Sequence, residues 1–229
     1  MKQIVIIGGG SSIKPELDNG LWDKLKGKFT IGCNYSYKFF QSTIQCFVDH
    51  KFYTEEVVGL KDLPLIIGNY HANLNFLKKE NTILLPSIGV YTRNVKRGVY
   101  KASLVGIFAL TLATCFLEES EIYLLGYDLG ADKKDNRNRF ITHFYQSTKE
   151  GSLHHRGIGK VGYYKSRRRS HYDFGCFKEV KGVKIYNVSP ESKLEEFEKI
   201  TYKEFYKKLN REKLDQDKIR ENILKKIKE

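Results

Sequence analysis

The sequence motif with the clearest chemical meaning is a glycine-rich turn near residue 10. The stretch IVIIGGGSSIKP, residues 4–15, places Gly8 and Gly10 directly after an apolar strand and adds the hydroxyls of Ser11 and Ser12. Glycines let a backbone approach a phosphate closely, and the start of a helix offers free N–H groups to an anion. The spacing is neither GxGxxG nor GxxxxGK[ST], so the turn predicts a phosphate site without identifying the ligand. The alternative is a tight strand-to-helix turn that binds nothing.

Polar side chains also end other predicted strands. Asn34 ends FTIGCN, Asp49 follows TIQCFV, and Asp128 ends EIYLLGYD. A carboxylate at such a position suits a ribose or sugar hydroxyl, or a Mg²⁺ ion held together with phosphate. Asp49 and Asp128 are therefore candidates to share a metal from neighbouring strand ends. Capping of a turn is the alternative role for Asp128.

Strands and helices alternate along most of the chain. The hydrophobic pattern predicts strands over 3–8, 29–34, 43–50, 63–69, 81–86, 121–128 and, as the last strand, 183–190. Helices are predicted over 15–27, 51–60, 103–119 and 191–200. This alternation predicts an α/β fold with a doubly wound, Rossmann-like, mostly parallel sheet. Ligands of such a sheet bind beyond the carboxyl ends of its strands, where the polar residues above are expected.

The charge is unevenly distributed. Lys and Arg total 40 against 27 Asp and Glu, a net charge of +13. Residues 131–171 hold eleven Lys or Arg against three acids and lack a sustained apolar period. This segment is interpreted either as a solvated basic loop or as a basic lid over an anionic ligand, inserted in a nucleotide-binding α/β domain that spans residues 1–200.

Residues 201–229 form a separate basic, helix-forming tail. They carry ten basic and six acidic residues, with a thin apolar stripe made of Phe205, Leu209, Leu214, Ile219, Ile223 and Ile227. One interpretation is a solvated helix packed on the core. The other is a peripheral contact with a membrane or with a second subunit.

Composition excludes several classes of protein. With 41% hydrophobic and 13% aromatic residues, the chain has the composition of a folded domain. It has no run of 18 apolar residues and no signal-peptide pattern, which predicts a cytoplasmic protein that is at most membrane-peripheral. The cysteines have no metal-type spacing, so buried reduced thiols are expected and no cysteine metal site is predicted: Cys33, Cys46, Cys115 and Cys176.

Five segments together resemble a known family. They are IVIIGGGSSI, IGCNYSY, GIFALTLATCFLEESEIYLLGYDL, THFY and GVKIYNVSPESKLEEF. In order and rough spacing they are similar to the bacterial sialyltransferases of glycosyltransferase family 42. They also resemble a broader group related to the archaeal 6-hydroxymethylpterin pyrophosphokinase, which shares the nucleotide-binding core. The resemblance covers about four-fifths of the chain.

The resemblance implies roles for individual residues. Gly8, Gly10, Ser12 and Asn34 would contact the nucleotide donor, and Gly106 matches a glycine beside it. His143 in THFY matches the general base that deprotonates the acceptor hydroxyl, a role suited to an imidazole with a pKa of about 6.5. Because the match depends on THFY across a shorter insertion, three other histidines are alternatives: His154, His155 and His171.

The sequence also departs from the sialyltransferases. No tyrosine follows GYD to hold the departing phosphate, so Arg137, Arg139 or the cluster 167–169 are candidates for that role. Leu104 and Val105 replace a Thr-Ser pair before Gly106. Asp49 replaces an asparagine, which favours the kinase-like relatives.

Three functions are therefore predicted as alternatives. The first is metal-independent transfer of a sugar from a nucleotide-sugar donor to an acceptor, which would be an anionic glycan or nucleic acid. The second is Mg²⁺-dependent pyrophosphoryl transfer from ATP. The third is nucleic-acid binding, with Tyr163, Tyr164 and Tyr172 near the basic run 165–169 as stacking surfaces. The resemblance also implies a homo-oligomer.

Overall fold

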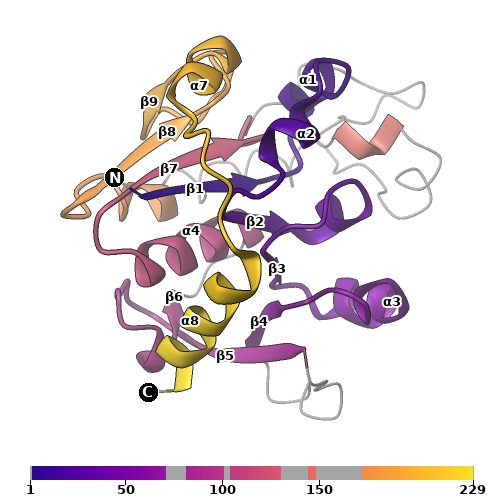
Figure 1. Cartoon of the computed structure of the whole chain (residues 1–229). Coiled ribbons are helices and arrows are strands. Elements are labelled where there is room, and N and C mark those ends of the chain that lie inside the picture. Colours follow the sequence, from indigo (N-terminus) through magenta and orange to yellow (C-terminus); the bar gives the residue numbers. More distant parts are fainter. Residues whose placement is uncertain (1, 71–80, 101–103, 130–143, 148–171, 229) are drawn as a thin grey trace, which may run out of the picture.

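The computed structural model describes residues 2–70, 81–100, 104–129, 144–147 and 172–228. Their core is one nine-stranded sheet in the order β6-β5-β4-β3-β2-β1-β7-β8-β9, in which every pairing is parallel (Figure 1). The fold is therefore α/β and Rossmann-like, as the alternation predicts. The strands are β1 Lys2–Ile7, β2 Thr30–Cys33, β3 Ile44–Phe47, β4 Ile66–Tyr70, β5 Thr82–Ile88, β6 Val99–Tyr100, β7 Ser120–Leu125, β8 Val183–Asn187 and β9 Glu198–Lys199.

The strand order reverses direction between β1 and β7. From β1 the chain builds outward to β6, then returns through helix α4 (Val105–Phe116) to place β7 on the other side of β1. The two strands pair over their full length, from Lys2↔Ser120 to Ile7↔Leu125, so they end at the same level. In open α/β folds, the usual ligand position is a crevice at the carboxyl edge of the sheet where the strand order reverses in this way.

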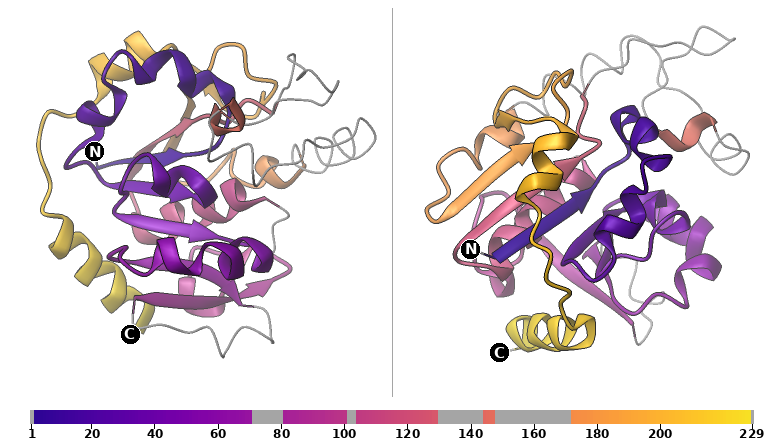
Figure 2. Two further views of the ribbon diagram at one scale, coloured as in Figure 1. Left: turned by 90° about the vertical axis from the view of Figure 1, so that its right-hand side faces the viewer. Right: turned by 45° about the horizontal axis from the view of Figure 1, so that its top comes forward.

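Two apolar layers cover the two faces of the sheet. Along β1, Ile4 and Ile6 join one buried cluster while Val5 and Ile7 join the other, which is the period of two expected for a strand covered on both sides. The first layer contains α4, ten of whose residues are buried. The second contains the helices α1 (Lys14–Leu17), α2 (Leu21–Leu25), α3 (His50–Leu60) and α7 (Tyr202–Lys208) (Figure 2).

Several predicted elements differ from the observed ones. The helix expected over 15–27 is two short helices, because Gly20 takes a left-handed conformation (φ 71°) between them. β8 is followed by β9, so it is not the last strand. The segment 191–200 is not a helix but a series of turns and bends that leads into β9. Long-range hydrogen bonds hold it: Lys193 N–H donates to Asp128 O (2.7 Å) and Ile200 N–H to Asn187 O (2.9 Å).

The C-terminal tail packs on the body of the protein. It forms α7 and, after a break, α8 (Gln216–Lys228). Its apolar stripe is divided between the two buried clusters, since Phe205 packs with the second layer and Ile223 with the first. The remaining stripe residues line the same clusters, so this apolar surface is already covered by the protein itself.

Within the described part of the chain, no helix combines the length and the apolar character needed to cross a bilayer.

Candidate functional site

The glycine-rich turn packs directly against the end of β7. Gly8 N–H donates to Leu125 O and Gly10 N–H to Gly126 O, both at 2.8 Å. A Cβ on Gly8 would lie 2.8 Å from Gly126 O, and one on Gly10 would lie 2.5 Å from the same atom. These two glycines are therefore required by the close approach of two strand ends, whether or not a ligand binds here.

Asp128 occupies the start of the turn that the sequence assigns to phosphate. Its carboxylate accepts hydrogen bonds from Ser12 N–H (2.9 Å), from Ser12 Oγ (2.5 Å) and, at 3.4 Å, from Ser11 Oγ. Asp128 thus caps the turn, as the alternative reading of the sequence has it. A phosphate placed at Ser12 N–H would meet this negative charge, so the anion-binding groups of the site are expected beside the turn and not at Ser12.

A buried network fixes the backbone that carries Asp128. Ser192 Oγ donates to Tyr127 O (2.6 Å), and Asn187 Nδ2 donates to Ser192 Oγ (2.9 Å). Lys199 Nζ in turn donates to Ser192 O (2.7 Å). The closing sequence YNVSPES therefore locks the end of β7 in place, a structural role that its polar composition did not reveal.

Asn34 has two unusual features at the carboxyl end of β2. It adopts a left-handed conformation (φ 47°), which few non-glycine residues do. Its side-chain oxygen Oδ1 is buried and has no hydrogen-bond partner among the described residues, while its main-chain carbonyl accepts from Gln45 Nε2 (2.7 Å). The second non-glycine residue with positive φ in the described chain, Leu129 (φ 42°), directly follows Asp128. Backbone strain of this kind concentrates at functional sites.

Helix α4 begins at the same edge of the sheet. Its N-cap, Leu104, provides no side-chain hydrogen bond, and its first turn contains no acidic residue. Gly106 in that turn contacts the ring of Tyr127, whose hydroxyl donates to Gly106 O (3.0 Å). The predicted Gly106 thus stands at an uncapped helix N-terminus, where main-chain N–H groups and the helix dipole favour an anion.

The insertion is anchored on the glycine turn at one described point. In the short helix η5 (Phe144–Ser147), Phe144 N–H donates to Gly9 O at 2.7 Å. The Phe144 ring lies 5.1 Å from the Phe39 ring, and Tyr145 lies 5.4 Å from Tyr35. Three predicted residues of the insertion, His143, Arg137 and Arg139, lie outside the described residues, as do the alternatives His154, His155 and His171.

Asp49 and Asp128 follow strands that are not neighbours in the sheet. Asp49 lies beyond the end of β3 and Asp128 beyond the end of β7. These two strands are three positions apart in the sheet, or roughly 14 Å at the usual strand spacing. Ligands of one Mg²⁺ ion all lie within about 2.1 Å of it. No group of three His, Cys, Asp or Glu side chains able to hold a metal occurs in the described part of the chain. Asp49 is exposed and precedes α3, where its carbonyl accepts from Tyr53 N–H (3.2 Å). The expectation that these two strand ends are neighbours was therefore wrong, and a metal ion shared by the two carboxylates stays a prediction.

Burial controls the titration of the groups around the site. It raises the pKa of Tyr35 to about 12, with the nearby carboxylates of Glu56, Glu55 and Asp49 adding to the effect. Burial also raises the pKa of the Cys46 thiol well above its ordinary value, and Cys33 Sγ lies 3.9 Å from it. The Tyr35 hydroxyl and the Cys46 thiol therefore stay protonated near neutral pH. They can donate hydrogen bonds but do not act as bases or nucleophiles there.

Comparisons with other proteins add no assignment to this geometry. The chain matches no protein-family model, no curated protein and no solved structure.

Proposed function

We propose that the protein is a nucleotide-sugar-dependent glycosyltransferase that uses the crevice between β1 and β7. The observation that carries the proposal is Asn34, whose buried side-chain oxygen lacks a partner in the described structure and which stands in a strained conformation beside the crevice. An unpartnered buried acceptor costs about 1–3 kcal/mol, so a ligand that supplies a hydroxyl or amino donor is favoured there. The ribose and base of a nucleotide supply both.

The charge distribution suggests how the donor would lie. Because Asp128 is bonded to Ser12, the donor phosphate would lie at the uncapped start of α4, near Gly106. Arg137 and Arg139, or the arginines at 167–169, would neutralise the departing nucleotide in place of the family's tyrosines. The sugar bond to the nucleotide phosphate breaks, the phosphate oxygen keeps the electron pair, and the acceptor oxygen forms the new bond.

His143 would accept the proton of the acceptor hydroxyl. A neutral imidazole suits this step because its ordinary pKa is close to neutral pH. The observation that supports this role is that Phe144, the next residue, donates its N–H to Gly9 O of the glycine turn. The acceptor is proposed to be anionic, an anionic glycan or nucleic acid, because the insertion 131–171 carries eleven basic and three acidic residues.

The test is a thermal-shift screen with CMP, CDP, UDP, GDP and ATP, each with and without Mg²⁺. A ligand at 100 times its Kd stabilises the native state by about 2.7 kcal/mol. The variant Asn34→Gly tests whether the unpartnered side-chain oxygen of Asn34 binds the nucleotide. Glycine tolerates the positive φ at this position, and the substitution removes only the side chain. We expect this variant to fold but to lose the shift.

The catalytic role needs a second variant. His143→Ala is expected to keep the nucleotide shift and to lose transfer to the acceptor. The proposal fails if no nucleotide stabilises the protein, or if only ATP with Mg²⁺ does, which would favour pyrophosphoryl transfer. If a nucleotide raises the melting temperature of Asn34→Gly as much as that of wild type, Asn34 does not bind the nucleotide.

A further inference from the structure

A pocket lies at the opposite, amino edge of the sheet. It has a volume of about 670 Å³ and is lined by residues that precede β6, β7 and β8 and by the ends of α4 and α8. This volume falls in the range of small-molecule sites. The pocket is distant from the β1–β7 crevice, because it opens where the strands begin and the crevice lies where they end.

Arg93 lines this pocket and is held by main-chain carbonyls. Its Nε donates to Thr114 O (3.1 Å), Nη1 to Lys181 O (2.8 Å), and Nη2 to Leu117 O and Glu118 O (2.9 Å each). The guanidinium therefore joins the last turn of α4 to the loop before β8. Its positive charge also opposes the negative end of the α4 dipole, and Lys226 Nζ assists by donating to Phe116 O (2.9 Å).

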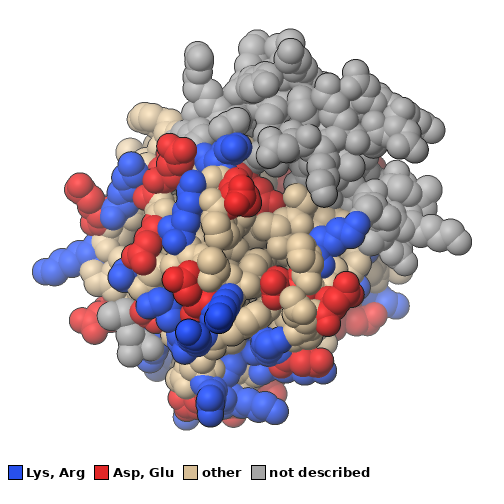
Figure 3. All heavy atoms as spheres, turned by 90° about the horizontal axis from the view of Figure 1, so that it is seen from above, with Lys and Arg blue, Asp and Glu red and all other residues tan. Residues whose placement is uncertain are grey.

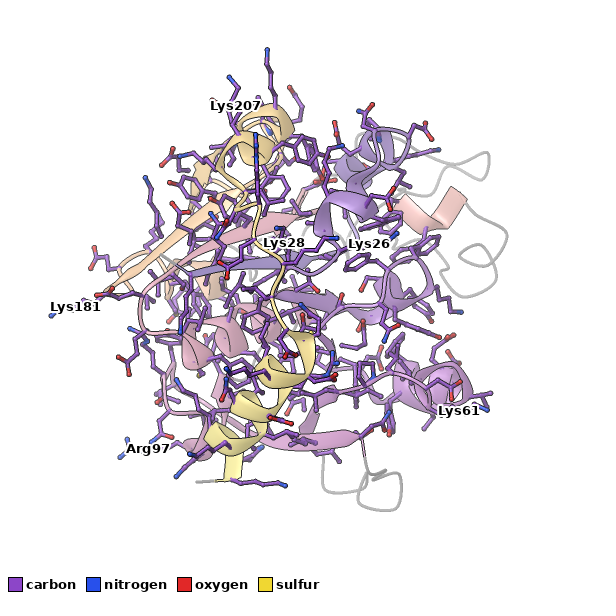
Figure 4. The ribbon with its side chains drawn as sticks, in the orientation of Figure 1. Lys26, Lys28, Lys61, Arg97, Lys181 and Lys207 are labelled. Atoms are coloured by element: carbon purple, nitrogen blue, oxygen red, sulfur yellow. The ribbon has the colours of Figure 1, made fainter. Side chains whose placement is uncertain are left out.

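The rim of the pocket carries cations that are not paired with carboxylates. Lys96 and Lys181 are exposed, and neither has an acidic side chain within 4.0 Å among the described residues. The lining holds four basic side chains against two acidic ones, Glu118 and Glu119. Arg97, next to Lys96 in sequence, lies on the same side of the molecule as Lys181 (Figure 4).

This local excess differs from the mixed charge seen on one other face of the molecule. The insertion alone holds eleven basic residues against three acids, so most of the net charge of +13 lies outside the described residues. On the face shown in Figure 3, Lys and Arg side chains alternate with Asp and Glu. A concave, positively charged site concentrates field lines and raises the local concentration of anions.

We propose that this pocket is an accessory site for phosphate groups, separate from the crevice. Lys96 and Lys181, from two different segments of the chain, line a pocket of suitable volume. The guanidinium of Arg93, which donates to four carbonyls, lines the same pocket. Lys and Arg side chains are common partners of phosphate groups in proteins. The phosphate would belong either to a free small ligand or to the phosphodiester backbone of a nucleic acid.

The test uses two double charge reversals with the same net change. Lys96→Glu/Lys181→Glu alters the pocket, whereas Lys61→Glu/Lys207→Glu alters two exposed lysines elsewhere on the molecule, after α3 and on α7 (Figure 4). Urea unfolding first establishes that both variants fold. Binding is then measured by calorimetry with inorganic pyrophosphate and by fluorescence anisotropy with a 12-base-pair DNA duplex, each at two or more salt concentrations.

The two probes distinguish the two sources of phosphate. For a free ligand, we expect wild type to bind pyrophosphate and the pocket variant to bind it at least tenfold more weakly, with less than a twofold change in the control. For a phosphodiester, the slope of log K against log salt should become shallower by roughly 2 in the pocket variant, since each neutralised phosphate contributes about 0.9.

Other results would overturn the proposal. These are the absence of binding to both probes, equal losses in the pocket and control variants, or unchanged binding in the pocket variant. Glu118→Gln/Glu119→Gln gives a gain-of-binding check, because removing two negative charges from the lining should tighten the same interaction severalfold. The outcome does not depend on the nucleotide screen of the crevice, so either proposal can fail alone.

Discussion

Gly106→Ala should destabilise the protein, against the ordinary effect of this change in a helix. Alanine normally stabilises a helix by about 0.5–1 kcal/mol relative to glycine. At Gly106 a Cβ would lie 2.8 Å from Tyr127 Cε1 and 3.1 Å from Cζ and the hydroxyl oxygen, so the ring would have to move. Tyr127 is only 5% exposed, contacts the Phe174 ring at 5.9 Å and donates its hydroxyl to Gly106 O.

The expected magnitude follows from these two opposing effects. Overpacking of a well-filled core costs about 1–3 kcal/mol, which leaves a net loss of ~1–2 kcal/mol after the propensity gain. Urea unfolding measures this directly: with an m value of about 2 kcal/mol per molar urea, the midpoint should fall by roughly 0.5–1 M.

A double-mutant cycle isolates the cause. In a Tyr127→Leu background the ring is gone, so Gly106→Ala should become neutral or stabilising, whereas Tyr127→Phe should give no rescue because Cε1 remains. If Gly106→Ala is as stable as wild type in the original background, the close packing described here does not limit this position. If it is equally destabilising in both backgrounds, Tyr127 is not the cause.

Three further predictions concern stability and titration. Arg93→Met should lower the free energy of unfolding by about 1–3 kcal/mol, because two part-buried carbonyls and two exposed ones lose a charged donor; Arg93→Lys should restore only part of it, and full recovery with lysine would contradict the need for the planar group. At pH 8 a thiol reagent should react rapidly with the exposed Cys176 alone and with all four cysteines after unfolding, and rapid reaction of two or more in the native state would show that the others are not protected by burial. Because the folded pKa of Tyr35 is raised to about 12 from 10.0, its contribution to stability is fully present below pH 10 and is lost as the pH rises toward 12; a Tyr35→Phe variant should lose less stability over that range in urea titrations, and an identical pH profile would exclude this contribution.

The sequence was sufficient for the central elements because their patterns are strong. The apolar run of β1, the long buried α4 and the strand EIYLLG give the parallel sheet and place the glycine turn at its carboxyl edge. β6 was not predicted, because a two-residue strand has no period to detect. The helix expected over 191–200 was wrong. Leu194 and Phe197 are spaced as on a helix and both are buried, but the segment that carries them follows turns and bends fixed by long-range hydrogen bonds.

The candidate site was predicted in position more than in detail. Gly8, Gly10, Asn34, Gly106 and Asp128 all lie along the predicted edge. That Asp128 would turn back onto Ser12, and that Asp49 would be three strands away, depends on the strand order, which hydrophobic periodicity does not encode. The role of Arg93 was equally hidden, because its acceptors are main-chain carbonyls distant in sequence.

The pairing of β1 with β7 has a consequence for synthesis on the ribosome. Gln3 and Glu121, joined by a hydrogen bond across these strands, are separated by 118 residues. β1 therefore cannot pair with β7 until the ribosome has synthesised the segment from β2 to α4. Contacts between such distant residues slow folding. On the side that faces β7, β1 therefore has no strand to pair with until residues 120–125 have been synthesised.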